Sequence, residues 1–156
     1  MVRAIGNGND STVEPENGFT PSRATEMLPL VSRIVADMAT LTKTINAQRE
    51  QLKGVDALSD TISHESYRDE LRDIRASLEE DEQRLADCFD ELAVLGVRPH
   101  HPFDGGVDFP ATLNRRPVFL CWMLGEDTVV HWHDPDSQPK LRQAIDSQKF
   151  GAESLN

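Results

Sequence analysis

Two long stretches of this sequence carry core-type residues in alternating steps of four and three, the spacing of one face of a coiled-coil helix. The first stretch has these positions: Met27, Val31, Ile34, Met38, Leu41, Ile45, Gln48 and Leu52. The second has Tyr67, Leu71, Ile74, Leu78, Asp81, Leu85, Cys88, Leu92 and Leu95. Two such amphipathic stretches in succession predict a long antiparallel helical hairpin, coiled-coil-like in its packing.

Both predicted helices have end signals. Thr20 and Pro21 supply a helix N-cap and a proline suited to the first helical position. Gly96 suits the position just after the last turn of the second helix. Pro29 lies inside the first helix and removes a backbone hydrogen bond, so we expect a kink or a short first turn there. Residues 54–65 fit either a continued helix or a linker.

The C-terminal third has the pattern of strands and turns. An apolar run over residues 118–124 is followed by the turn residues Gly125-Glu126-Asp127 and by a second run over residues 128–133. The pair Asp134-Pro135 then ends the second run. This order predicts a β-hairpin.

The length of the hairpin loop decides which side chains share a face. With an even-numbered loop, Leu120 would lie opposite His133, and Trp122 opposite His131. The other face, which should then meet the helices, would be wholly apolar: Phe119, Cys121, Met123, Val130 and Trp132. A three-residue loop shifts every pair by one and undoes this assignment.

The sequence therefore predicts an α+β fold, a long helical hairpin packed with a small C-terminal β-hairpin unit. We expect one domain over residues 19–146, with the helical hairpin in 19–96 and the β-unit and its loops in 97–146. Residues 1–18 and 147–156 have the composition of a disordered lead-in and tail. A chain of 156 residues is long enough for one such core and too short for two.

The net charge of the protein limits the kinds of molecule that it is expected to bind. The chain has 16 Lys and Arg against 27 Asp and Glu, a formal net charge of −11. Such an acidic protein is not expected to bind nucleic acid or an anionic membrane surface. No run approaches the ~20 apolar residues of a membrane span, and the N-terminus lacks the apolar segment of a secretory signal. With only two cysteines, the expected compartment is a reducing cytoplasm.

Several short motifs stand in a recognisable order. They are Phe19-Thr20, Leu28-Pro29, Gly105-Gly106-Val107-Asp108-Phe109-Pro110-Ala111, Cys121-Trp122-Met123-Leu124-Gly125-Glu126 and Trp132-His133. With these motifs the sequence resembles a bacterial family catalogued as domain of unknown function 2203, over roughly residues 19–145. It departs from the family pattern at Arg142-Gln143-Ala144-Ile145, where the family tends to have Arg-x-Pro-Ile/Leu. The resemblance implies no activity.

His131 and His133 form the most suggestive pair for chemistry. Alternate residues of a strand point to the same face, so both imidazoles could bind one ion. The further donors available are His100, His101, Asp104 and Asp108. Imidazole and carboxylate together suit zinc or another divalent transition metal. The alternative is a pair of half-buried histidines that bond to backbone or carboxylates.

Other residues have a structural interpretation beside a functional one. Cys88 and Cys121 fall on predicted core faces, where thiols are usually inert packing residues. Trp122 could line a ligand pocket together with Asp104, but packing in the core is the simpler role. Asp108, just before Phe109-Pro110, could be a turn cap or a metal ligand.

Two functions from different classes follow. The first is an interaction or structural protein that acts through a self-associating helical hairpin, with a homodimer or a protein partner. Leu28, Val35 and Thr42 widen the first helical stripe beyond what one facing helix covers. The second is a metal-binding protein or a metal-dependent hydrolase, centred on His131, His133 and Asp108.

Overall fold

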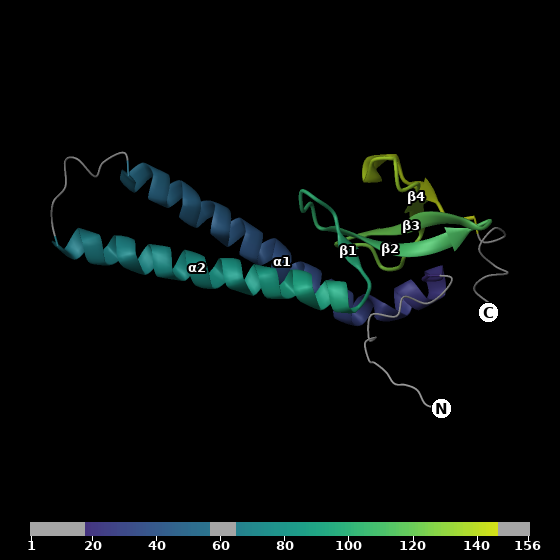
Figure 1. The fold of residues 1–156 in the computed structure, drawn as a ribbon, viewed down its shortest axis with the longest axis horizontal. Helices are drawn as coiled ribbons and strands as arrows, with labels where there is room; N and C mark the ends of the chain where they lie inside the picture. The colour runs from purple at the N-terminus through teal and green to yellow at the C-terminus, as the bar shows by residue number, and fades with distance from the viewer. Residues whose placement is uncertain (1–17, 57–64, 147–156) are drawn as a thin grey trace, which may run out of the picture.

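The computed structural model describes residues 18–56 and 65–146, and over these it confirms the α+β class (Figure 1). Helices α1 (Pro21–Asp56) and α2 (Glu65–Val94) form the hairpin. Five antiparallel strands follow in the order β1-β2-β3-β4-β5. They are β1 (Arg98–Pro99), β2 (Gly106–Leu113), β3 (Arg116–Met123), β4 (His131–His133) and β5 (Gln143–Ala144), with a 3₁₀ turn η2 (Pro139–Leu141) before β5.

The helix ends follow from the predicted signals. Helix α1 begins at Pro21, and the Thr20 hydroxyl accepts a hydrogen bond from the Arg23 N–H at 3.1 Å. Helix α2 ends at Val94, and Gly96 has the left-handed φ of +79° that suits its C-terminal cap. Pro29 lies within α1, whose first turns are at an angle to the rest of the helix in Figure 1.

The two polar positions of the helical stripes meet each other. The Gln48 amide donates hydrogen bonds to Asp81 Oδ2 at 3.0 Å and to the Ser77 hydroxyl at 3.1 Å. This contact joins the hairpin where the apolar packing is interrupted. A polar pair at core positions of a coiled coil fixes the register of the helices.

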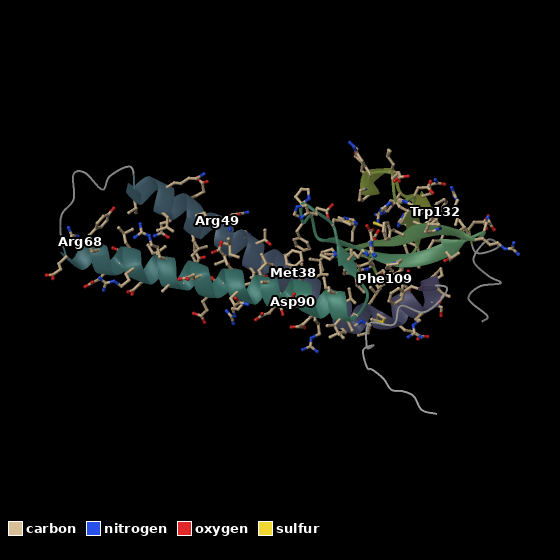
Figure 2. All side chains as sticks on the ribbon, viewed as in Figure 1. Met38, Arg49, Arg68, Asp90, Phe109 and Trp132 are labelled. Carbon is tan, nitrogen blue, oxygen red and sulfur yellow. The ribbon has the colours of Figure 1, made fainter. Side chains whose placement is uncertain are left out.

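The core lies between one face of the sheet and the first half of α1 with the end of α2. Figure 2 labels three of its side chains, Met38 of α1, Phe109 of β2 and Trp132 of β4. Alternate residues of the longer strands supply the sheet face: Val107, Phe109, Ala111, Leu113, Val118, Leu120 and Trp122. The C-terminal end of α1 and the N-terminal end of α2 project away from the sheet (Figure 1).

The register of β3 and β4 corrects the pairing expected for an even-numbered loop. Leu120 lies opposite Trp132, and Cys121 opposite His131. Because Cys121 pairs with His131, the segment between these two residues has an odd number of residues, and Glu126 is its middle residue. The Glu126 carboxylate accepts a hydrogen bond from the Met123 N–H at 2.8 Å and so stabilises this turn. The predicted apolar face is therefore wrong for β3, because Leu120 shares the core with Trp132, while Cys121 lies on the opposite face.

Two further expectations change. Val130, expected on the core face, is 46% exposed. Gly18, expected in the disordered lead-in, forms a β-bridge with Ala111, and the neighbouring Phe19 N–H donates to Pro110 O at 2.7 Å. The rest of the predicted lead-in, the predicted tail and the ambiguous residues 57–64 lie outside the described residues. Within the described ranges, neither helix has the length and apolar character needed to cross a bilayer.

Candidate metal centre

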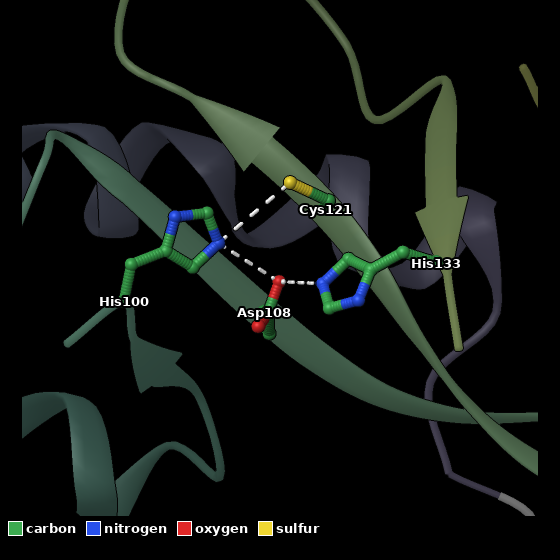
Figure 3. Close-up of side chains that lie close together, drawn as sticks. All are labelled: His100, Asp108, Cys121 and His133. Carbon is green, nitrogen blue, oxygen red and sulfur yellow. Dashed lines mark hydrogen bonds and ion pairs between the residues drawn. The ribbon is translucent and has the colours of Figure 1, made fainter. Parts of the chain in front are cut away.

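Four side chains converge on the sheet face that points away from the helices (Figure 3). Asp108 of β2 and Cys121 of β3 are directly paired, and His133 comes from the neighbouring β4. His100, just after β1, completes the group. All four residues are buried, and their ligand atoms lie within 4.8 Å of one another. Adjacent strands thus bring together residues from positions 100 to 133 of the chain.

The Asp108 carboxylate lies at the centre of the group. Its Oδ1 is 3.0 Å from His100 Nε2 and 2.9 Å from His133 Nε2. Cys121 Sγ is 3.7 Å from the same His100 Nε2. One carboxylate oxygen, two imidazole nitrogens and one sulfur therefore lie within 4.8 Å of one another.

Each histidine has an outer partner that fixes its ring. His100 Nδ1–H donates to Asp104 Oδ1 at 2.8 Å, and the same oxygen accepts the Gly106 N–H at 2.9 Å. His133 Nδ1–H donates to the backbone carbonyl of Asp134 at 2.9 Å. In both rings the Nδ1 proton points outward, and Nε2 faces the group. Metal-binding histidines usually have this arrangement, with the far nitrogen bonded to a carboxylate or a carbonyl.

Without an ion, the charges of this group favour a protonated His100. Burial disfavours the imidazolium, but hydrogen bonds to Asp108 and Cys121 and the charges of Asp108 and Asp104 outweigh it. Together they raise the pKa of His100 to about 10. The carboxylates thus hold a proton on His100 where a metal cation could replace it.

Local sequence makes room for the His100 ring. A Cβ atom at Gly106, the first residue of β2, would overlap the imidazole of His100 and the sulfur of Met123. Only glycine at this position lets the ring approach the strand. The Gly105-Gly106 pair therefore has a packing role beside the turn that it makes.

An ion pair borders the group on the Cys121 side. Arg142 makes two hydrogen bonds to Glu126, at 2.9 and 2.8 Å, and its guanidinium lies 4.0 Å from Cys121 Sγ. Burial would raise the pKa of Glu126, but the bonds from Arg142 and from the Met123 N–H lower it. The Glu126–Arg142 pair thus lies at the edge of the group, next to the sulfur.

The predicted site residues have different places. His100, Asp108 and His133 belong to the group, and Asp104 is the outer partner of His100. His131 instead faces Glu126, with Nδ1 3.6 Å from Oε2, and His101 is exposed. Trp122 is 1% exposed in the helix-facing core. Asp104 also lines an open cleft of about 520 Å³ beside α1, together with Lys43, Asn46 and Phe103.

Cys121 is the member that sequence reasoning missed. The even-numbered loop put it on the helix-facing side, where a thiol is ordinary packing. The alternative with a three-residue loop moves Cys121 to the opposite face. In the observed register, Cys121 lies on the face turned away from the helices and pairs with Asp108 of β2 and His131 of β4.

The distances suit a tetrahedral ion. With ordinary zinc bond lengths, a nitrogen and an oxygen ligand would be about 3.3 Å apart, and a nitrogen and a sulfur ligand about 3.6 Å. The corresponding separations here are 2.9 to 3.0 Å and 3.7 Å. These three separations are within a few tenths of an ångström of the zinc values, and all six separations among the four ligand atoms are no longer than 4.8 Å.

A second chemistry uses the same atoms. Cys121, His100 and Asp104 form a chain of the nucleophile, base and orienting-carboxylate type. However, Cys121 is 0% exposed, so a substrate could not reach its sulfur. The arrangement suits an ion better than acyl transfer.

Comparison with known proteins places the chain in a family. The model of a family described as "Uncharacterized conserved protein (DUF2203)" matches residues 17–145. No curated protein and no solved structure matches the chain. The matched range contains all four converging side chains and extends through Arg142. Since it covers most of the sequence, the chain belongs to the DUF2203 family.

Proposed function

We propose that this protein binds a divalent transition metal, with Zn²⁺ the best fit, through His100, Asp108, Cys121 and His133. The observation that carries the proposal is the orientation of the two histidines. Both have Nδ1 bonded to an outer acceptor and Nε2 within 3.0 Å of the same Asp108 oxygen. A mixed set of nitrogen, oxygen and sulfur donors suits Zn²⁺ and is unsuited to Mg²⁺ or Ca²⁺.

Charge balance supports the same choice. Two neutral imidazoles, one carboxylate and one thiolate carry a charge that cancels that of a divalent cation. A buried charge is costly unless it is paired, so the neutral sum is favourable at a site this enclosed. The competing interpretation is a metal-free network in which Asp108 accepts hydrogen bonds from protonated histidines.

Calorimetric titration separates these alternatives. Metal-stripped protein, purified without a metal-affinity tag, is titrated with Zn²⁺, and we expect one ion per chain. His133→Ala should abolish this binding. The matched control is His131→Ala, which removes a histidine from the same strand and should leave the stoichiometry unchanged. Absence of binding by the unmodified protein, or equal binding by His133→Ala, would contradict the metal site.

Self-association through the helices is a second proposal, and a specific surface favours it. Leu30 is 46% exposed and Val94 is 68% exposed, and with Ile34 and Leu95 they line a shallow, mainly apolar groove. Exposed apolar side chains gathered in one place are typical of contact surfaces. The width of the apolar stripe on the first helix is weaker support for self-association, because Leu28 and Val35 of that stripe are covered within the core.

Sedimentation equilibrium at micromolar concentration tests this second proposal. We expect a homodimer, and the variant Leu30→Glu with Val94→Glu should be monomeric. The control is Leu141→Glu, an exposed apolar residue in η2 that should not affect assembly. A 17.5 kDa species for the unmodified protein would contradict the dimer.

A further inference from the structure

We infer that the ion has a structural role, as a closed four-ligand staple that holds β1 and β4 onto the central strands. This inference rests on the proposed metal site and assigns it a role. It separates the protein from metal hydrolases, whose zinc keeps a position open for water or substrate. Two observations carry it, the enclosure of the four donors and the shortness of the strands that they join.

The donor set is complete and enclosed. Zn²⁺ in structural sites is bound by four protein side chains, and four are present here. The exposed fractions are 0% for Cys121, 3% for His133, 5% for His100 and 8% for Asp108. An ion among these atoms would have its tetrahedral positions filled by protein. A substrate would have to displace a buried ligand to reach it.

The ligands join two short strands to the long central pair, although β4 also pairs with β5 at two positions. Strand β1 has two residues and pairs with β2 at two positions, and β4 has three residues and pairs with β3 at three. The central strands β2 and β3 have eight residues each. His100 follows the short β1 and His133 ends the short β4, whereas Asp108 and Cys121 lie on the long pair. One ion would thus tie the two short strands β1 and β4 to the central ladder.

The main apolar cluster lies on the opposite face, and the ring contact of Phe119 with His133, at 5.6 Å between centroids, lies on the face that carries the ligands. On the helix side, β4 contributes Trp132 to the core. On the other face, His133 of β4 bonds to Asp108, and His100, just after β1, bonds to the same carboxylate. Without the ion, the hydrogen bonds of Asp108 to His100 and His133 would be the connection between these side chains on this face. We therefore expect the short strands β1 and β4 to open most easily in the metal-stripped protein.

Co²⁺ in place of Zn²⁺ tests whether the site is closed. The Co²⁺-loaded protein should show the intense absorption of a tetrahedral site, and added azide should leave the spectrum unchanged. A spectrum that changes on azide addition would reveal an open position and overturn the staple, although metal binding would stand. Absence of any Co²⁺ spectrum, together with no Zn²⁺ uptake, would instead refute the proposed function itself.

Amide hydrogen exchange tests where the ion acts. On metal removal, we expect exchange in β4 and around His100 to rise by about tenfold or more, while amides near Ile45 and Leu71 in the helical hairpin keep their rates. His131→Ala, which keeps all four ligands, should show the same metal-dependent protection as the unmodified protein. Equal rates with and without the ion, or a uniform rise over sheet and helices, would overturn the inference.

Discussion

Cys121 lies directly opposite Asp108 in the β2–β3 ladder, on the sheet face turned away from the helices. Directly opposed residues of an antiparallel pair have their Cβ atoms close together, so a thiol and a carboxylate from two strands can bind the same ion. Arg142 lies 4.0 Å from the sulfur and Glu126 holds the guanidinium. The position of this cysteine adds a sulfur donor to the two histidines and the carboxylate of the candidate metal centre.

We therefore expect the two cysteines to differ in what they contribute to the proposed metal binding. Cys121→Ser should remove the sulfur-to-metal charge-transfer absorption of the Co²⁺-loaded protein and weaken Co²⁺ binding. Cys88→Ser is the matched control, since Cys88 is also buried but lies in α2. It should keep the absorption unchanged. Loss of the band in Cys88→Ser, or its persistence in Cys121→Ser, would place the thiolate ligand elsewhere.

Asp104 should affect the ion without touching it. Its Oδ1 bonds to His100 Nδ1 at 2.8 Å and fixes which imidazole nitrogen faces the group. Asp104→Asn should lower Zn²⁺ affinity by about 10- to 100-fold, the usual effect of losing an outer partner of a ligating histidine. Competition with a chelating dye measures this change. Asp136→Asn, at an exposed position, is the control and should bind as the unmodified protein does. Equal affinities of the two variants would contradict the role of Asp104.

Sequence periodicity predicted the helical part of the fold well, for a physical reason. The seven-residue repeat, the Thr20 cap and Gly96 are local features, and each acts within a few residues of its position. The polar positions Gln48 and Asp81 are recognisable in the same way, and they bond to each other. Local rules of helix formation are therefore sufficient for this half of the molecule.

The strand register could not be predicted in the same way. A slip of one residue exchanges the two faces of a strand, and the slip depends on how Glu126 folds the turn. The Glu126 contacts include Arg142, which is distant in sequence. His100, His133 and Asp108 were found because their chemistry is evident from residue type, but the same reasoning also selected His131 and His101, which lie outside the group. Cys121 was missed because its role depends on the face that it occupies.

Gly106 should be intolerant of any side chain. A methyl group there would overlap His100 and the sulfur of Met123, so Gly106→Ala should destabilise the protein by about 1–3 kcal/mol, the usual cost of overpacking. The contrasting control is Gly54→Ala in α1, where an added Cβ meets nothing within 4 Å. That change should stabilise the helix by about 0.5–1 kcal/mol. Denaturant unfolding of both variants measures the difference, and equal midpoints would show that Gly106 has no such packing role.

Trp132 should be essential to the contact between sheet and helices. It is 6% exposed, lies opposite Leu120 and belongs to the same apolar cluster as Val31 and Met38. Truncation of a large buried aromatic leaves a cavity, so Trp132→Ala should cost about 3–5 kcal/mol of the free energy of unfolding.

Val130 provides the matched control for this truncation. It was predicted to share the face of Trp132, but it is 46% exposed, so Val130→Ala should change the free energy of unfolding by no more than about 0.5 kcal/mol. Urea unfolding followed by circular dichroism gives both values, and metal-stripped protein should be used so that ion binding does not contribute. A midpoint for Trp132→Ala equal to that of the unmodified protein would mean that this strand face does not pack on the helices, and that the register on which the metal centre depends is wrong.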